Sequence, residues 1–232
     1  RGEVPALMGE NGAGKNTLMK VLTGIYQKDS GTITYKGKET EFHNTREAQD
    51  AGVVIVHQEL NMMGHLTVAQ NIFAGREFKK GMFVDDAKMI SEARKLFDRM
   101  CIDIDPTEIM SNLTVGKQQM CEIAKAISHD CKVIIFDEPT AMIDPESRKE
   151  LLEAIYDLKR LKNITVIYIT HFLQEVSQAD YLYVMSHGKI TLKGTPETLF
   201  KIPEKLVENN LELPFEVALI DDLRKKSVDV PE

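Results

Sequence analysis

The sequence lacks tryptophan and is poor in cysteine. Its 232 residues include no Trp and three Cys, which are Cys101, Cys121 and Cys131. An odd number excludes a fully paired disulfide framework, and the absence of any C-x-x-C spacing argues against a structural zinc site. We therefore expect a protein of a reducing compartment, with three free and buried thiols.

Long hydrophobic runs and a basic surplus are also missing. Aliphatic or aromatic runs such as Val53 to Val56 and Val133 to Phe136 are far shorter than the roughly 20 residues that a membrane-spanning helix needs. Lys and Arg number 29 against 36 Asp and Glu, which gives a formal net charge of -7. This acidic balance disfavours anionic lipid and nucleic acid as partners, so we expect no nucleic-acid partner.

The start of the chain lacks an initiator methionine and the apolar core of a signal peptide. We interpret the sequence as a cytoplasmic fragment whose natural beginning is missing. The remaining composition, 43% hydrophobic and 28% charged, is that of a folded chain with a substantial core.

Short β-rich runs alternate with helical patterns along the chain. Several runs are apolar on both faces, which is typical of strands in a helix-covered parallel sheet. Glycine-containing turns at 30–31, 36–38 and 186–189 indicate antiparallel pairs. We predict an α/β fold in which antiparallel edges flank a mostly parallel sheet, with strands at Val4–Met8, Thr32–Tyr35, Val53–His57, Val133–Phe136, Thr165–Thr170 and Tyr181–Met185.

Between Asn61 and Asp130 the strand pattern gives way to helical spacing of apolar residues, notably in 86–100 and 120–127. This block is predicted to be a helical subdomain inserted into the α/β core. The expected organisation is a first part of the core at 1–60, the helical subdomain at 61–130, a second part of the core at 131–200 and a C-terminal helical tail at 201–232.

A glycine-rich loop stands between the first predicted strand and a helical segment. Residues 9–17 have the sequence Gly-Glu-Asn-Gly-Ala-Gly-Lys-Asn-Thr, close to the phosphate-loop pattern G-x-x-x-x-G-K-[ST]. Glycines let backbone N–H groups approach an anion, and the N-terminus of the following helix adds partial positive charge. The loop therefore predicts nucleotide-phosphate binding by Gly9, Asn11, Gly12, Ala13, Gly14, Lys15, Asn16 and Thr17, with Lys15 reaching the β- and γ-phosphates.

Two consecutive carboxylates, Asp137 and Glu138, end an apolar strand. In a phosphate-loop protein the first would hold the Mg²⁺ shell and the second would polarise the attacking water. A strand that merely exits into a polar turn is the simpler interpretation of an isolated Asp-Glu pair. The phosphate loop upstream in the same chain favours the catalytic interpretation.

The order of these motifs resembles that of ATP-binding-cassette ATPases over nearly the whole chain. The phosphate loop is followed by Gln58 after a strand, then by 113–119, 137–140, Asp144 and His171. The resemblance implies that Gln58 is the Q-loop residue, which binds the nucleotide, senses Mg²⁺ and couples to a transmembrane partner. It also implies that Asp144 belongs to the D-loop and that His171 is the catalytic switch histidine beside Glu138.

In this family a signature loop completes the ATP site of a second copy. The matching segment here is Leu-Thr-Val-Gly-Lys at 113–117, where the family pattern is Leu-Ser-Gly-Gly-Gln. It precedes a predicted helix, whose N-terminus can present an anion site. Lys117 replaces a Gln and adds charge beside the shared nucleotide. The implied residues of this trans site are Thr114, Val115, Gly116, Lys117 and Asp144.

Asn16 departs from the family pattern, because a neutral amide oxygen stands where the Mg²⁺-binding hydroxyl belongs. Thr17 lies about 100° further round the helix and cannot take its place. We expect magnesium binding to weaken more than phosphate contact; the implied metal ligands are Asn16, Gln58 and Asp137. Family members also have a first strand and an adenine-stacking aromatic in the region before Arg1, so adenine binding is expected to suffer.

Two parts of the chain resemble different branches of the family. Residues 9–127, with Gln58 in His-Gln-Glu-Leu and with the V-G-x-Q-Q signature, resemble ribose- and galactose-type sugar importers. From about Val133 onward, residues 137–145 and the tail resemble energy-coupling-factor ATPases of vitamin and metal uptake. A recombined or engineered chain explains this mixture more easily than a divergent natural importer.

The resemblance implies an ATP-hydrolysing subunit that uses ATP and Mg²⁺ to power an importer. Its expected partners are a second ATPase domain, in a head-to-tail homo- or heterodimer, and transmembrane permease subunits, which place it in the cytoplasm at the inner face of the membrane. Two alternatives stay open. One is a nontransport ATPase of the family, and the other is a folded domain that hydrolyses ATP poorly because of Asn16 and the missing strand.

Overall fold

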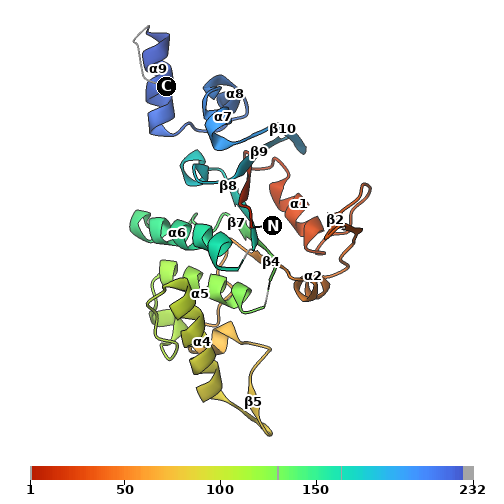
Figure 1. Cartoon of the computed structure of the whole chain (residues 1–232), viewed down its shortest axis with the longest axis vertical. Helices are drawn as coiled ribbons and strands as arrows, with labels where there is room; N and C mark the ends of the chain where they lie inside the picture. Colours follow the sequence, from red (N-terminus) through yellow and green to blue (C-terminus); the bar gives the residue numbers. More distant parts are fainter. Residues whose placement is uncertain (1, 130, 163, 227–232) are drawn as a thin grey trace.

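A six-stranded β-sheet forms the centre of the molecule (Figure 1). The computed structural model describes residues 2–129, 131–162 and 164–226. The strands of this sheet are β1 (Pro5–Met8), β4 (Val53–Val56), β7 (Val133–Asp137), β8 (Thr165–Thr170), β9 (Tyr181–Ser186) and β10 (Lys189–Gly194). They lie in the order β10-β9-β1-β8-β7-β4, in which all neighbours are parallel except β10 and β9.

This sheet confirms the predicted α/β class, and each of the six predicted strand segments contains a strand. The expected antiparallel edges are corrected on one side. The early hairpin of β2 (Thr34–Tyr35) and β3 (Lys38–Glu39) forms a two-stranded sheet of its own, so in the described part of the chain the edge opposite β10 is β4, which is parallel to β7.

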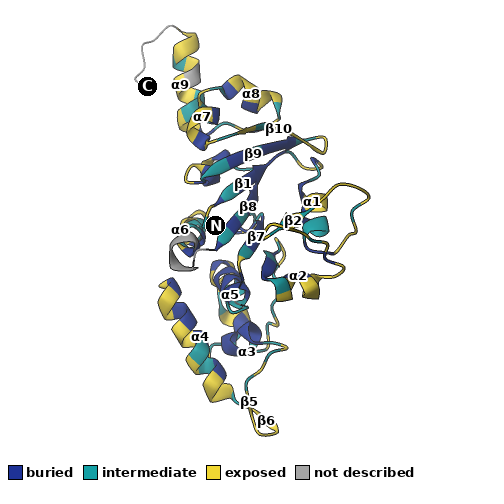
Figure 2. Cartoon of the chain, turned by 45° about the vertical axis from the view of Figure 1, so that its right-hand side comes forward, coloured by how far each residue is buried: buried dark blue, intermediate teal, exposed yellow. Residues whose placement is uncertain are grey.

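Helices cover both faces of the sheet (Figures 1 and 2). On one face lie α1 (Lys15–Leu22) and α2 (Thr45–Ala51), and on the other lies α6 (Pro145–Lys162). Successive strand side chains enter different hydrophobic clusters: Leu7 and Ile135 pack with Met19 of α1, whereas Met8 and Phe136 belong to the larger cluster. Burial on both faces explains why the strand sequences are almost continuously apolar.

The middle of the chain is mainly helical. It contains α3 (Val68–Ile72), α4 (Asp86–Met100), the short 3₁₀ helix η1 (Met110–Asn112) and α5 (Val115–Ile127). A hairpin of β5 (Lys79–Lys80) and β6 (Phe83–Val84) was not predicted. Met82 and Phe83 are highly exposed, so the hairpin has no core-facing alternation that the sequence pattern could show. Residue 130, the predicted end of this block, lies outside the described residues.

The C-terminal part contains a short 3₁₀ helix, η2 (Leu173–Val176), and then α7 (Pro196–Phe200), α8 (Pro203–Glu208) and α9 (Phe215–Lys225). Proline stands in the first turn of α7 and α8, where its missing N–H costs nothing. Residues 227–232 of the predicted tail lie outside the described residues. Within the described ranges no helix has the length and apolar character required to span a membrane. The division into subdomains stays a prediction.

The expectation of three buried thiols is corrected at one position. Cys121 and Cys131 are buried, whereas Cys101 is exposed. Cys101 follows the last turn of α4 in a left-handed conformation, with φ of 54°, just beyond the buried Met100. Burial raises the pKa of the Cys121 thiol to about 12, because it disfavours the thiolate.

Candidate functional site

The glycine-rich loop is held closely around the start of α1. Gly14 caps this helix with φ of 101°, a conformation that glycine adopts without steric cost. A side chain on Gly9 would collide with the backbone oxygen of Met185. The N–H of Gly188, in the β9–β10 turn, donates to the oxygen of Ala13 at 2.8 Å. The β9–β10 turn therefore packs against the glycine-rich loop and hydrogen-bonds to it.

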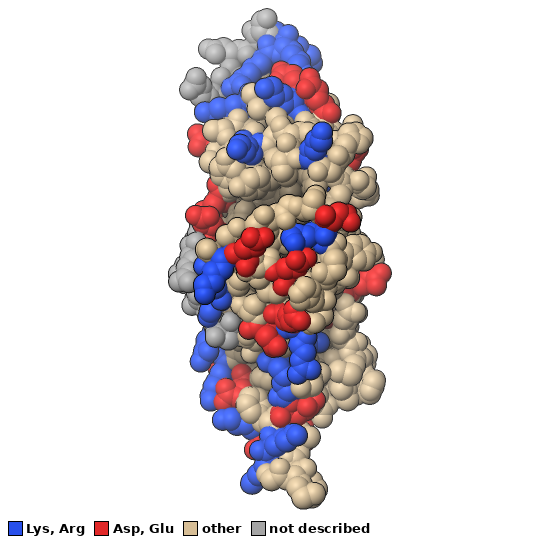
Figure 3. Space-filling view, turned by 90° about the vertical axis from the view of Figure 1, so that its right-hand side faces the viewer, with Lys and Arg blue, Asp and Glu red and all other residues tan. Residues whose placement is uncertain are grey.

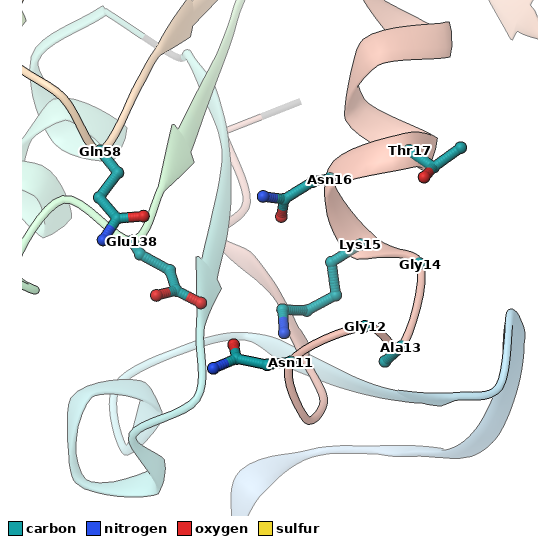
Figure 4. Close-up of a pocket in the computed structure, with 9 residues that line it drawn as sticks. All are labelled: Asn11, Gly12, Ala13, Gly14, Lys15, Asn16, Thr17, Gln58 and Glu138. Atoms are coloured by element: carbon teal, nitrogen blue, oxygen red, sulfur yellow. The ribbon is translucent and has the colours of Figure 1, made fainter.

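A cavity of about 300 Å³ lies against the loop (Figure 4). Across it, the side chains of Gln58 and Glu138 face Asn16 and Lys15. The first turn of α1 borders the cavity with backbone N–H groups that have no earlier turn to pair with. All predicted nucleotide-binding residues except Gly9 line this space, together with Glu138: Asn11, Gly12, Ala13, Gly14, Lys15, Asn16, Thr17 and Gln58.

Lys15 is turned into the loop and is only 4% exposed. Its Nζ donates to the backbone oxygens of Gly9 at 2.6 Å and Glu10 at 3.0 Å. Burial lowers the pKa of Lys15, and the nearby carboxylates of Glu138, Asp137 and Glu10 act in the opposite direction. The ammonium group is thus fixed at the cavity wall; its predicted contact with phosphates stays a prediction.

Asp137 has the properties expected of a metal ligand. It ends β7, is 9% exposed, and its Oδ1 is buried without a hydrogen-bond partner among the residues that the structure describes. Burial, and then the neighbouring Glu138, raise the pKa of this carboxyl group. A divalent cation would supply the missing partner of Oδ1, so the oxygen atoms of Asp137, Gln58 and Asn16 fit the preference of Mg²⁺ for hard ligands.

Glu138 and His171 meet at the carboxyl ends of β7 and β8. Nδ1 of His171 lies 3.3 Å from Oε2 of Glu138, within ion-pair range, although Nδ1 makes no hydrogen bond. Glu138 has φ of 48°, in the left-handed region, which costs a non-glycine residue of the order of 1–3 kcal/mol. Its N–H donates to the oxygen of Ile169 in β8 at 3.0 Å. The two predicted catalytic side chains are therefore brought together.

The predicted signature residues do not line this cavity. Thr114 caps α5, and its side chain accepts from the N–H of Lys117. Thr114, Val115 and Lys117 are exposed, whereas Gly116 is buried against Ser147 of α6. Nζ of Lys117 donates to the oxygen of Asp103 at 3.5 Å. An exposed loop apart from the cavity is what a trans site requires, and that role stays a prediction.

Asp144 is exposed and lies at the start of α6. Its carboxylate accepts from the N–H of Ser147 at 3.0 Å, and this hydrogen bond lowers its pKa. The geometry gives Asp144 a helix-capping role. Its predicted role in the D-loop is additional to that and remains a prediction.

Sequence reasoning missed one residue close to this site. Glu175, in η2, is buried and hydrogen-bonded to Thr140 and Thr170, which lie close in sequence to the predicted catalytic residues Glu138 and His171. The signal in the sequence is weak, since it consists of a carboxylate four positions after His171 that is preceded by Gln174 and followed by Val176. Such a position is equally compatible with an exposed turn.

Comparisons with known proteins agree with this geometry. The family described as "ABC transporter" matches residues 1–141. A putative ribose/galactose/methyl galactoside import ATP-binding protein of Burkholderia ambifaria is 51% identical over 191 residues, which cover 81% of this chain and 37% of the relative. The galactose/methyl galactoside import ATP-binding protein MglA of Escherichia coli is 46% identical over 187 residues, covering 80% and 37% respectively. The chain thus spans less than two-fifths of these curated relatives.

Solved structures show the same architecture. The structure of cbiO1 from Clostridium perfringens, part of the ABC transporter complex cbiONQ, has a TM-score of 0.76 and 28% identity, covering 95% of this chain and 88% of that one. The ADP conformation of an ATP-binding cassette of an ABC transporter has a TM-score of 0.79 and 26% identity, covering 90% and 88%. With its glycine-rich loop, its paired carboxylates and these relatives, the chain belongs to the ABC transporter family.

Proposed function

We propose that this chain binds and hydrolyses ATP to drive import of a sugar through a membrane permease. The observation that carries the proposal is the placement of Glu138, 3.3 Å from His171, across the cavity from the glycine-rich loop. The curated relatives are import proteins for ribose, galactose or methyl galactoside. A sugar of this class is therefore the proposed cargo.

In the proposed reaction the amides of the loop and Lys15 bind the phosphates. Glu138 orients the attacking water and accepts its proton. His171 contacts Glu138 through one ring nitrogen and binds the γ-phosphate through the other. The strained backbone of Glu138 fixes the direction of its carboxylate.

Asp137, Gln58 and Asn16 are the proposed ligands of Mg²⁺, and the partnerless Oδ1 of Asp137 supports this assignment. When bound, the ion supplies charge that neutralises the β- and γ-phosphate oxygens. Asn16 brings an amide oxygen on a longer side chain in place of the usual compact hydroxyl, so we propose a weaker dependence of ATP affinity on Mg²⁺ than the usual motif gives.

The proposed working unit is a head-to-tail pair of ATPase domains, held at the inner face of the membrane by permease subunits. The exposed Thr114, Val115 and Lys117 of the predicted signature loop and the exposed Asp144 support this arrangement, because none of them lines the cavity of its own chain. A nucleic-acid partner is not supported. On the face shown in Figure 3, acidic and basic side chains are mixed along the molecule.

The test is ATP turnover by the Glu138→Gln variant. The amide keeps the shape of the side chain but loses the charge that orients water, so ATP affinity should persist while the hydrolysis rate falls by about 10²-fold or more. Glu153→Gln, an exposed change on α6, is the matched control and should keep the parent rate. ATP turnover close to that of the parent in Glu138→Gln would show that Glu138 is not the residue that activates water.

A second candidate is an ATP-binding domain that does not hydrolyse, and the position of Asn16 in the cavity wall is the observation that favours it. Steady-state hydrolysis by the parent chain separates the two. Binding of ATP without phosphate release would select the second candidate.

A further inference from the structure

Glu175 is a buried carboxylate that stands outside the cavity. It is 4% exposed and lies in η2, which follows the segment of His171. Burying an ionised carboxylate is unfavourable unless hydrogen bonds or a counter-charge replace its hydration. The groups around Glu175 must therefore compensate the burial of its carboxylate.

Three hydroxyl groups surround this carboxylate. Oγ1 of Thr140 donates to Oε1 at 2.6 Å. Tyr168 and Thr170 donate to Oε2 at 2.8 and 2.7 Å. Burial and the adjacent Glu175 raise the pKa of Tyr168 well above its usual value, so this phenol remains a donor at neutral pH.

A cation lies at the edge of the cluster. Nε of Arg148 is 3.9 Å from Oε1 of Glu175, and it has no hydrogen-bond partner. The hydroxyl groups thus make the short contacts with the carboxylate, while Arg148 adds a more distant charge. Nη2 of Arg148 also donates to the backbone oxygen of Ile143 at 3.4 Å, the residue before Asp144.

The threonine partners of Glu175 lie next to the two predicted catalytic residues. Thr140 is two residues beyond Glu138, and Thr170 directly precedes His171. Oγ1 of Thr170 additionally accepts from the N–H of Phe172 at 3.0 Å, so it fixes the turn that carries His171. One buried side chain thus links both catalytic loops and, through Arg148, the segment of Asp144.

We propose that Glu175 is a positioning residue, which holds Glu138 and His171 at the separation needed for ATP hydrolysis. This inference rests on the proposed function, since it concerns the rate of that reaction. A carboxylate accepting from both loops fixes their distance more tightly than the His171–Glu138 contact, which lacks a hydrogen bond. Small misplacements of reacting groups reduce rates strongly.

The expected effect separates positioning from ordinary core stabilisation. Glu175→Gln keeps the volume but removes the charge and one acceptor oxygen, so the hydroxyl groups at one end of the side chain must reverse or lose their hydrogen bonds. We expect kcat to fall roughly 10- to 100-fold with KM for ATP within about twofold of the parent. In a His171→Ala background the same change should cost less than in the parent, because part of the effect of Glu175 acts through His171.

Thr140→Val is a second route to the same contact if Glu175→Gln folds poorly, and Thr140→Ser restores the hydroxyl. Thr140→Val should lower kcat and Thr140→Ser should recover it. Tyr156→Phe is the matched control, since Tyr156 donates to the backbone oxygen of Glu175 and not to its carboxylate. This control should leave kcat unchanged. Equal losses in Tyr156→Phe and Thr140→Val would overturn the proposal.

A readout that needs no turnover keeps the inference separate from the proposed function. In protein labelled with ¹⁵N-histidine, the ring signals of His171, assigned with His171→Asn, should shift in Glu175→Gln and Thr140→Val but not in Tyr156→Phe. Unchanged His171 signals in folded Glu175→Gln would overturn the inference. A parent chain without ATP hydrolysis, but with shifted signals, would overturn the proposed function and keep the positioning role.

Discussion

Lys15 and Asn16 are adjacent in the sequence but differ in their surroundings and in the ligand that each is proposed to bind. Lys15 is held by backbone oxygens of its own loop, and its burial beside carboxylates keeps it fixed before any anion arrives. Asn16 faces Gln58 and Glu138 across the open space. The residues of the proposed phosphate site are therefore already in place around Lys15, whereas the proposed metal site contains Asn16 as an unusual ligand.

We predict that Asn16→Ser raises Mg²⁺-dependent activity, because it restores a compact hydroxyl ligand. The measurement is ATP affinity and turnover across a Mg²⁺ titration, with Thr17→Ser as a control that changes the neighbouring hydroxyl residue. An unchanged affinity and an unchanged rate in Asn16→Ser would count against Asn16 as a metal-site residue.

The thiols should differ in reactivity. With a pKa of about 12, Cys121 is about one part in 10⁴ thiolate at pH 8, and it is buried as well, so an alkylating reagent should spare it in the native state. Cys101 is exposed and should react first. Mass spectrometry after brief alkylation, with Cys101→Ser as control, checks this order. Native-state modification of Cys121 at the rate of Cys101 would contradict the burial described.

At the scale of elements, α5 and α6 meet at the signature loop. A Cβ atom built on Gly116 would lie 2.6 Å from Cβ of Ser147 in α6. The backbone of α5 can approach α6 this closely only because Gly116 has no side chain. The signature glycine therefore has a packing role within the chain, whatever it contributes to a second copy.

Gly116→Ala should lower the free energy of unfolding by about 1–3 kcal/mol, because the added methyl group overpacks the α5–α6 contact. Chemical denaturation measures this, and Gly116→Ala combined with Ser147→Gly should recover part of the loss. Lys117→Ala, an exposed change in the same turn, is the control. If Gly116→Ala had the same free energy of unfolding as the parent, α5 and α6 would be able to move apart here at little cost, which would contradict the prediction.

Elements with a regular buried pattern were predictable, and elements without one were not. Both faces of β7 are buried, so its apolar run indicated a strand, and the positions of Asp137 and Glu138 followed from its end. In the β5–β6 hairpin Met82 and Phe83 are exposed, so its sequence shows no alternation of buried apolar and exposed polar residues. The placement of Glu175 depends on long-range packing of β7, β8 and α6, which no local pattern encodes.

At the scale of the whole molecule, the predicted signature loop lies apart from the cavity of its own chain, and we propose that it completes the ATP site of a second chain. This separation predicts that ATP links two chains. Glu138→Gln, which should bind ATP without consuming it, is expected to become dimeric with Mg-ATP and to stay monomeric with ADP. Light scattering after size-exclusion chromatography gives the mass directly. A monomer under saturating Mg-ATP would leave the head-to-tail arrangement without support.

The mixed resemblance of the chain stays a hypothesis. The 191-residue match to the Burkholderia ambifaria relative must cross the expected join between Ile127 and Val133, because the chain has 232 residues. Its sequence identity is one value for both segments, so it does not compare them. We predict that residues up to Ile127 and residues from Val133 superpose best on different transporter subfamilies. Hydrophobic swaps of conserved volume at such a join cost less than about 1.5 kcal/mol each. One natural relative matching both segments equally well would remove the reason for this hypothesis.

The most direct test of the central claim is calorimetric titration of Mg-ATP into the parent chain and into Lys15→Ala. Lys15→Ala removes the charge aimed at the phosphates and should weaken binding by about 10- to 100-fold, the equivalent of losing a charge-assisted hydrogen bond. Lys38→Ala, which removes an exposed lysine of β3, should bind like the parent. Equal ATP affinity in the parent and in folded Lys15→Ala would contradict the assignment of this cavity as the nucleotide site.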